Sequence, residues 1–189
     1  MLMREWWTIL YSHKQCLEKY GSPHFLRKAL KSGELHQIER GIYSDSGIHV
    51  STMAVLAAKY PKAIVTMDTA FYYHGLTDVI PDEYYIATPE SSRALRDPRI
   101  KQVFENGSIF GVGATVMERQ DATFKIYGRE RMLIELLRYK NKLPYDYYKE
   151  ILGNYRALIG KLDIELIQEY AETFPKHKMI CNALEAEVF

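Results

Sequence analysis

The sequence has few cysteines, and neither of them belongs to a recognisable site. Its 189 residues hold two, Cys16 and Cys181, which lie near opposite ends of the chain. Neither is part of a C-x-x-C pair or of a Cys/His cluster with the spacing of zinc ligands. We therefore expect two reduced, mostly buried thiols in a cytosolic protein and no zinc site.

Long hydrophobic runs are also absent. No segment approaches the roughly 18 apolar residues of a transmembrane helix, and the N-terminus lacks the apolar stretch of a signal peptide. We expect a cytoplasmic protein with no membrane partner. With 47% hydrophobic and 26% charged residues, the composition is that of an ordinary globular protein. This length suits one large domain or two small ones.

Signatures of catalysis and cofactor binding are missing as well. Gly111-Val112-Gly113 lacks a third glycine and a following helix, which predicts a turn rather than a phosphate loop. No serine or cysteine nucleophile is paired with His74 by a known motif, so a packing histidine is favoured. The sequence thus predicts no enzyme, no catalytic residues, no cofactor and no bound metal.

A metal-dependent nuclease is the enzymatic alternative. It would draw on a group of carboxylates formed by Asp68, Asp78, Asp82 and Glu83. Such chemistry needs carboxylates that converge on a metal, usually with a lysine that positions water. Neither the strand predicted over 83–88 nor the one over 123–127 contains Glu-x-Lys, and Asp68 suits a helix start. The nuclease is the weaker hypothesis.

The stretch from Ser22 to Ser44 has the pattern of a basic helix followed by a hairpin. Ser22 is a good N-cap, Pro23 suits the first helical position, and Gly33 is placed to end the helix. One face of this helix is apolar, formed by Phe25, Leu26, Ala29 and Leu30. The remaining arc is basic, formed by Arg27, Lys28 and Lys31.

A turn at Arg40-Gly41 follows, between two short apolar segments that predict the strands of a wing. Upstream, helices are predicted over 4–11 and 14–20, and Gly21-Ser22 forms the tight turn before the basic helix. These elements predict a winged helix-turn-helix domain over residues 1–47. The polar loop at residues 45–47 is the expected junction to a second domain over 48–189.

The charge distribution agrees with a DNA-binding head on a near-neutral body. Residues 1–44 hold seven Lys and Arg against four acidic residues, an excess of three. The whole chain has a net charge of +1, so the remaining 145 residues carry a net charge of −2. A basic module of this kind favours nucleic acid as the partner.

Each candidate DNA contact has an expected role. Arg27 can form two hydrogen bonds to a guanine edge, while Lys28 and Lys31 are expected to pair with phosphates. Ser22 and His24 lie at the helix N-terminus, where they can contact a base edge or a phosphate. Arg40 lies at the wing tip and is expected to contact the minor groove or the DNA backbone. The weaker candidates are His36 and Gln37.

The body is predicted to be α+β, with a small sheet and helices gathered after it. A helix is expected over 50–60, a strand over 63–66 and a helix over 69–74. Strands are expected over 83–88, 100–104, 115–118 and 123–127, followed by helices over 129–139, 145–159, 164–174 and 176–188.

Three segments together resemble the AbiEi family, the antitoxin half of the AbiE (type IV) abortive-infection toxin–antitoxin systems of bacteria. They are L-K-S-G-E-L-H-Q-I-E-R-G-I-Y at 30–43, T-M-D-T-A-F-Y-Y-H-G-L-T-D at 66–78, and F-K-I-Y-G-R-E-R-M-L-I-E-L-L-R-Y-K-N-K-L at 124–143. The first is common to many winged helices, whereas the order and spacing of the other two are more specific. The resemblance spans nearly the whole chain. It departs from the family pattern at Gly128, where a serine-like cap is expected, and at Glu135, where Asp is expected.

The resemblance implies a protein with two tasks. A winged helix would repress the protein's own operon by binding inverted repeats in its promoter, with two copies on double-stranded DNA. The C-terminal domain would counteract a nucleotidyltransferase-like toxin, without a stable complex between the two. For Glu130 and Arg131 we expect structural ion pairs or a helix-start network, with a contact to a partner or to RNA as the alternative.

A second hypothesis keeps the winged helix and dispenses with the toxin. The chain would then be a stand-alone transcriptional regulator whose body senses a ligand or mediates dimerisation. A nucleotidyltransferase-like reading frame beside the gene would favour the antitoxin.

Overall fold

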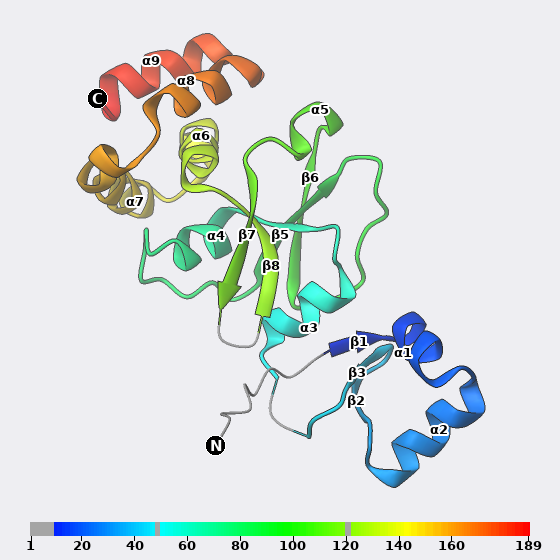
Figure 1. The fold of residues 1–189 in the computed structure, drawn as a ribbon. Coiled ribbons are helices and arrows are strands. Elements are labelled where there is room, and N and C mark those ends of the chain that lie inside the picture. The colour runs from blue at the N-terminus through cyan, green and yellow to red at the C-terminus, as the bar shows by residue number, and fades with distance from the viewer. Residues whose placement is uncertain (1–9, 48–49, 120–121) are drawn as a thin grey trace. The chain divides into compact units, whose positions relative to one another are not determined.

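The computed structural model describes residues 10–47, 50–119 and 122–189 (Figure 1). Both helices and strands are well represented, so the chain belongs to the α+β class, as predicted. It divides into two compact units, which we describe separately. Unit 1 comprises Met1–Lys62 and Val116–Phe124, and unit 2 comprises Ala63–Thr115 and Lys125–Phe189.

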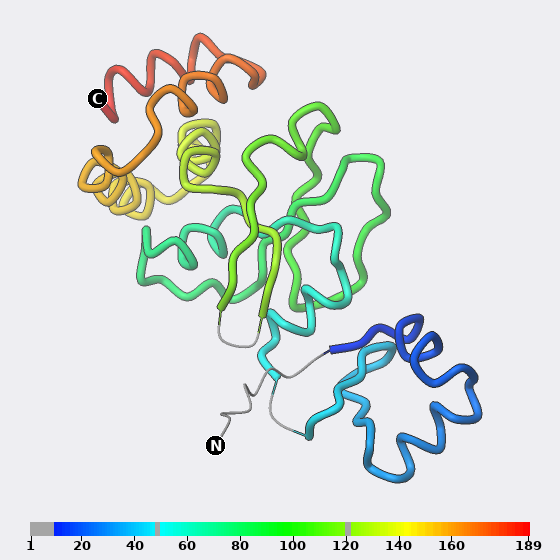
Figure 2. The backbone as a smooth tube through the Cα atoms, in the orientation of Figure 1, coloured from blue at the N-terminus to red at the C-terminus, as the bar shows by residue number. Residues whose placement is uncertain are grey.

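In unit 1, the described residues between 10 and 62 form a three-stranded antiparallel sheet and three helices. Its elements follow in the order β1 (Leu10–Ser12), α1 (His13–Tyr20), α2 (Pro23–Ser32), β2 (His36–Glu39), β3 (Ile42–Ser44) and α3 (Thr52–Lys59). The central strand is β3, which pairs with β1 on one side and β2 on the other. Figure 2 traces this path, in which the hairpin follows directly on α2.

The predicted helices of unit 1 agree with the structure from residue 13 onward. The helix predicted over 4–11 is wrong at its end, because Leu10 and Tyr11 lie in β1 and pair with Ser44 and Tyr43. Residues 4–9 of that prediction lie outside the described residues. The strand ends where Ser12 caps α1, through a capping box with Gln15.

The division into units does not coincide with the junction predicted after residue 47. Helix α3 groups with unit 1 because it contacts β1 and β3. Glu39 on β2 also forms an ion pair with Lys59 on α3, with 2.9 Å between the charged atoms.

The core of unit 1 lies between its helices and its sheet. Its buried members are Cys16, Leu26, Ala29, Leu35 and Tyr43. They come from α1, α2, the loop before β2, and β3, so one small cluster holds these elements together. Burial of a side chain such as Leu26 contributes about 1.5–3 kcal/mol.

Unit 2 contains most of a five-stranded sheet with the strand order β6-β5-β4-β8-β7, of which residues 116–119 and 122–124 group with unit 1. The strands are β4 (Ile64–Val65), β5 (Tyr84–Pro89), β6 (Ile100–Glu105), β7 (Ala114–Arg119) and β8 (Ala122–Tyr127). The sheet is mixed, since β5 pairs antiparallel with β4 and parallel with β6, while β4 pairs parallel with β8. All five predicted strands are therefore confirmed, with ends that shift by one or two residues.

The helices of unit 2 also follow the prediction. They are α4 (Met67–Tyr73), α5 (Gly107–Phe110), α6 (Arg129–Tyr139), α7 (Tyr145–Leu158), α8 (Ile164–Thr173) and α9 (His177–Glu187). Figure 1 shows α6 to α9 gathered in one group. The short helix α5 was not predicted, because four residues are too few for a periodic pattern; the Asn106 side chain caps it by accepting a hydrogen bond from the Ser108 amide. Across the described residues, none of the helices has the length and apolar character that a membrane span requires.

The turn at residues 111–113 packs against the start of α6, and Gly113 lies at the closest approach. Gly113 has φ +70°, and a Cβ atom placed on it would lie 2.5 Å from the Cβ atom of Arg131. Its carbonyl accepts a hydrogen bond from the Gly128 amide at 2.8 Å. The predicted turn is thus confirmed, and the lack of a side chain at Gly113 lets it approach α6.

We expect Gly113→Ala to lower the free energy of unfolding by about 2–4 kcal/mol, through the overlap with Arg131 and the left-handed backbone. The matched control is Gly111→Ala, because Gly111 has φ −84° and open space where a Cβ would stand. Urea titration of both variants measures the difference. Equal stability of the two variants would contradict the close packing described here.

Candidate nucleic-acid interface

Helix α2 begins and ends at the residues that the sequence marks as caps. The Ser22 side chain accepts a hydrogen bond from the Phe25 amide, Pro23 occupies the first turn, and Gly33 ends the helix with φ +76°. The helix therefore has the same bounds as the prediction, and its orientation in unit 1 is set by the burial of Leu26 and Ala29.

Four polar residues of α2 form a stripe opposite its buried face. His24, Arg27, Lys28 and Lys31 are all exposed, and their spacing of i, i+3, i+4 and i+7 places them on one side of a helix. We call these four residues the basic stripe. Because Leu26 and Ala29 face the core, the basic stripe has to face away from it. The structure thus brings together four of the predicted DNA contacts.

The cations of the basic stripe have no acidic partner among the described residues of unit 1. Across the described part of the chain, neither Arg27, Lys28 nor Lys31 takes part in an ion pair, and the Arg27 Nε atom donates a hydrogen bond to the Pro23 carbonyl. The acidic residues nearby are engaged elsewhere: Glu18 with Lys14, Glu39 with Lys59, Glu34 with the Tyr20 hydroxyl and Asp45 with the Tyr11 hydroxyl. The positive charge of the stripe is therefore available to an external anion.

The hairpin turn carries one further cation, Arg40, for which the described residues also provide no ion pair. Arg40 is exposed, and Gly41 beside it has φ +85°, which suits the tight turn. The Gly41 carbonyl accepts a hydrogen bond from the His13 amide at 3.0 Å, so the turn lies at the N-terminus of α1. Arg40 therefore lies next to α1 and not at the end of a long wing.

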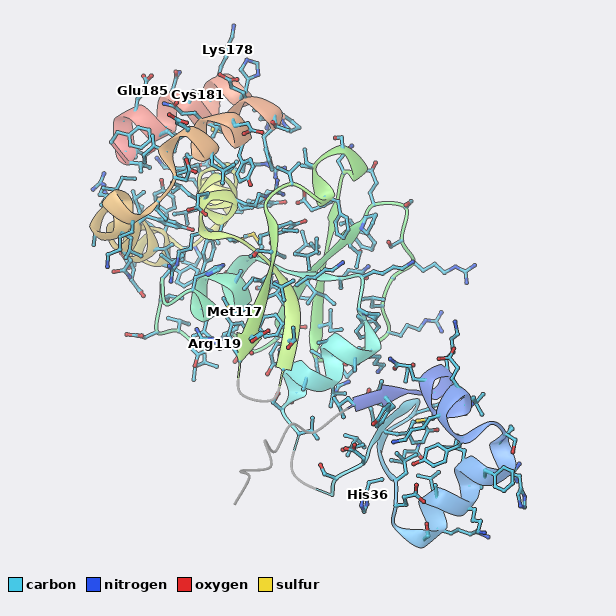
Figure 3. The ribbon with its side chains drawn as sticks, viewed as in Figure 1. His36, Met117, Arg119, Lys178, Cys181 and Glu185 are labelled. Carbon is cyan, nitrogen blue, oxygen red and sulfur yellow. The ribbon has the colours of Figure 1, made fainter. Side chains whose placement is uncertain are left out.

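The two weaker candidates on β2 lie apart from the turn. His36, labelled in Figure 3, is half-buried. It pairs with Ser44 at the opposite end of the hairpin from Arg40, and its ring lies beside Gly47. Gln37 is exposed and donates a hydrogen bond from its side chain to the Glu39 carbonyl at 3.4 Å. Neither residue lies on the same element as the basic stripe.

Phe25 differs from the prediction. It was assigned to the apolar face of the helix, yet 57% of it is exposed to solvent, and its ring contacts that of His24 edge to face. The reason is its position around the helix, between Lys28 and Ala29, where it reaches only the border of the core. The signal that could have revealed this is the angular position itself, since Leu26, Ala29 and Leu30 already fill the face opposite the stripe.

Unit 2 contains a buried network of charges around the first turns of α6. Arg131 is fully buried, and its guanidinium pairs with Glu135 and lies 3.5 Å from Glu105 at the end of β6. Arg138 binds both oxygens of Glu135, at 2.8 and 2.9 Å. The guanidinium carbon of Arg131 also lies 3.8 Å from the centre of the Phe174 ring. We call Glu105, Arg131, Glu135 and Arg138 the buried ion network.

Glu130 and Arg131 therefore lie in different surroundings, although they are neighbours in sequence. Arg131 belongs to the buried ion network, whereas Glu130 is half-buried and its side chain accepts a hydrogen bond from the Asp163 amide before α8. The structural role expected for this pair agrees with these contacts. Both residues tie α6 to other elements of unit 2.

Burial within the network changes the acidity of Glu135. Desolvation raises the pKa of its carboxyl to about 7, against the opposing attraction of Arg131 and Arg138. Burial also lowers the pKa of Arg131. The Glu135 side chain reaches the guanidinium groups of both Arg131 and Arg138.

The carboxylates considered for a nuclease do not form a group that could hold a metal ion among the described residues. Asp68 lies in the first turn of α4, as predicted, and burial raises the pKa of its carboxyl. Asp78 and Asp82 are exposed in the segment between α4 and β5. Among the described residues, no group of three or more His, Cys, Asp or Glu side chains is arranged to hold a metal ion.

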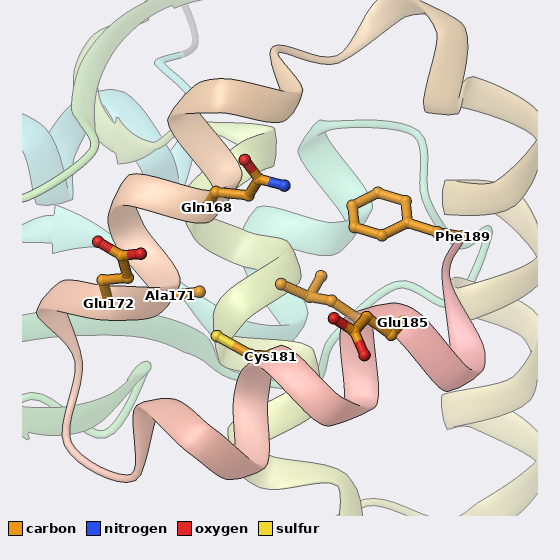
Figure 4. Close-up of a pocket in the computed structure, with 7 residues that line it drawn as sticks. Gln168, Ala171, Glu172, Cys181, Glu185 and Phe189 are labelled. Atoms are coloured by element: carbon orange, nitrogen blue, oxygen red, sulfur yellow. The ribbon is translucent and has the colours of Figure 1, made fainter.

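A pocket of about 300 Å³ lies between α8 and α9 (Figure 4). Its lining combines apolar residues with two carboxylates and a thiol: Gln168, Ala171, Glu172, Cys181, Leu184, Glu185 and Phe189. Cys181 is half-buried and Cys16 is buried, and both are free thiols, as expected. The pocket is at the lower end of the volumes typical of small-molecule sites.

Comparison with known protein-family models finds no match for the chain, and comparison with curated proteins finds no relative of significant similarity. The contacts and charges described above are therefore the basis for the functional argument.

The raised pKa of Glu135 predicts how stability varies with pH. In the unfolded chain this carboxyl titrates near its usual pKa of about 4.5, so between that value and about 7 the folded state binds more protons. Its contribution to the free energy of unfolding is complete below the lower value and is lost as the pH rises to the upper one.

We expect Glu135→Gln to remove this dependence, because the amide does not titrate. Relative to the variant, the wild-type chain should lose about 2–3 kcal/mol of unfolding free energy between about pH 4.5 and pH 7.5. Urea titrations of both proteins across this range measure the difference, with the exposed Glu185→Gln as control. A stability difference between wild type and Glu135→Gln that stays constant with pH would show that Glu135 has an ordinary pKa.

Proposed function

We propose that the chain is a cytoplasmic winged-helix protein that binds double-stranded DNA through α2 and represses its own promoter. The observation that carries this proposal is the basic stripe on the helix that follows the tight turn. Its three cations are exposed and form no ion pair with any residue that the structure describes. An uncompensated row of cations on an ordered helix is suited to the phosphate backbone and base edges of DNA.

The arrangement of unit 1 supports the same proposal. Helices α1 and α2 are joined by a short turn at Gly21-Ser22, and the hairpin of β2 and β3 follows directly. The strand order β1-β3-β2 attaches that hairpin to the strand that precedes α1. In helix-turn-helix proteins the second helix enters the major groove, which here is α2.

The individual contacts follow from this orientation. Arg27 is the side chain suited to a guanine edge, and Lys28 and Lys31 are suited to phosphates. Ser22 and His24 lie at the helix N-terminus, where amide groups and the helix dipole favour a phosphate. Arg40 is suited to the backbone or minor groove. One copy covers a half-site, so we propose that two copies bind an inverted repeat.

We expect Arg27→Ala and Lys31→Ala to weaken DNA binding in different ways. Loss of Arg27 should reduce discrimination at one base pair by about 1–3 kcal/mol. Loss of Lys31 should weaken binding to all sequences and lower the slope of log affinity against log salt by about 1. Gel shifts with the promoter and a scrambled duplex, over a series of salt concentrations, separate the two effects.

The control for both variants is Lys178→Ala, because Lys178 is an exposed cation on α9 in unit 2. Its affinity and salt slope should equal those of the wild type. If promoter affinity is unchanged in both α2 variants, the assignment of α2 as the DNA-binding helix is wrong.

We further propose that unit 2 is the part of an AbiEi-like antitoxin that counteracts a nucleotidyltransferase-like toxin. Support comes from the two body segments that resemble the family, 66–78 and 124–143, because they contact each other. The Nε2 atom of His74 donates a hydrogen bond to the Tyr127 carbonyl at 2.7 Å, and Arg129 donates one to the His74 carbonyl at 3.0 Å. Residues that define the resemblance thus form one packed centre.

The antitoxin proposal predicts rescue of growth without a stable complex. Cells that express the nucleotidyltransferase-like product of the neighbouring gene should stop growing, and full-length chain from an unrelated promoter should restore growth. The double variant Lys28→Ala/Lys31→Ala should rescue equally well, because the DNA contacts lie in unit 1. Affinity purification of the chain should recover no stoichiometric toxin.

Failure of rescue by a well-expressed wild-type chain would favour the stand-alone regulator. The pocket between α8 and α9 favours this second hypothesis, because a ligand-sensing domain needs a site for its ligand. Promoter binding that changes with a small molecule, in a cell without the toxin gene, would then be the expected behaviour.

A further inference from the structure

Phe25 is an exposed aromatic residue beside the proposed DNA-binding face. Among the described residues of 10–47, it is the one large hydrophobic side chain that is exposed, at 57%. Single exposed hydrophobic residues are common on protein surfaces and by themselves indicate nothing. What gives Phe25 significance is its position relative to the basic stripe.

That position is the first turn of α2, the helix that would enter the major groove. The Phe25 amide is tied to the Ser22 side chain, which fixes the first turn of the helix. Around the helix Phe25 borders Lys28, three residues on, and its ring contacts that of His24, which belongs to the stripe. The N-terminal residues of a second helix are those that reach base edges in helix-turn-helix proteins.

The chemistry of the major groove offers one apolar partner at this place. Each thymine presents its C5-methyl group there, and apolar side chains, including phenylalanine, read thymine through that methyl. The ring of Phe25 has no hydrogen-bonding group, so it can favour a base only by apolar contact. Its exposed surface would be covered when Lys28 beside it binds a phosphate.

We infer that Phe25 is a specificity-determining residue that contacts a thymine methyl group in the operator half-site. This inference rests on the proposed DNA binding by α2 and adds to it a base preference that Arg27 and the lysines do not provide. Burial of one methyl group contributes about fourfold to affinity, so the effect is small but measurable.

The test uses the full-length chain and a random duplex library, from which bound sequences are selected. Each thymine of the selected half-site is then replaced by uracil, which differs only in lacking the methyl group. For the wild type, one position should lose about threefold to tenfold in affinity. For Phe25→Ala, thymine and uracil should bind equally at that position. Phe25→Leu, which keeps an apolar side chain, should retain part of the preference.

Two controls separate this inference from its foundation. Phe25→Ala should keep the wild-type affinity for mixed-sequence DNA and its salt slope, because the cations are intact. Tyr145→Ala, which removes an aromatic residue of 68% exposure in unit 2, should leave the thymine preference unchanged. Circular dichroism and urea titration verify that Phe25→Ala is folded.

The outcomes are distinct. If the wild type selects no DNA at all, the proposal that α2 binds DNA is wrong, and the inference about Phe25 is wrong as well. If the wild type selects an operator but uracil replaces every thymine without loss, only the inference about Phe25 is wrong. The inference about Phe25 is also overturned if Phe25→Ala keeps the thymine preference. This holds even if sedimentation experiments show that the variant has lost self-association.

Discussion

The buried guanidinium of Arg131 is the constraint around which unit 2 is organised. A full charge without access to water is tolerated only when carboxylates and ring faces surround it, and here Glu105, Glu135 and Phe174 do so. These partners come from β6, from α6 and from the residue after α8. Gly113 lacks a side chain at the point where the turn meets Arg131. Arg131 therefore links the end of β6 to the helical group.

Unit 1 follows a different principle, in which a small apolar core orients a charged surface. Leu26 and Ala29 turn one side of α2 inward, so the basic stripe on the other side is displayed without any dedicated contact. Glu18, Glu34, Glu39 and Asp45 contact other partners, and among the described residues the cations of the stripe form no ion pair. A helix that packs against the core on one face and carries cations on the other needs little reorganisation to bind a polyanion.

Much of this was predictable from local patterns. The bounds of α2 follow from Ser22, Pro23 and Gly33, and the strands of unit 2 from short apolar runs between turn residues. The basic stripe was predictable for the same reason, because helical spacing is set by the backbone alone. For Leu10 and Tyr11, where prediction was wrong, the deciding partner was distant in sequence, because both residues pair with β3. The exposure of Phe25 follows instead from its angular position on α2, since Leu26, Ala29 and Leu30 fill the face toward the core.

The sequence by itself determined most of the helices and strands to within one or two residues, since caps, turns and periodicity act over a few residues. It also determined which residues of α2 share a face. Only the tertiary structure decided that Arg131 is buried between Glu105 and Phe174, that Glu135 titrates near neutral pH, and that His74 binds Tyr127. The physical reason is that burial and pairing depend on residues brought together by the fold, and no local pattern specifies which ones they are.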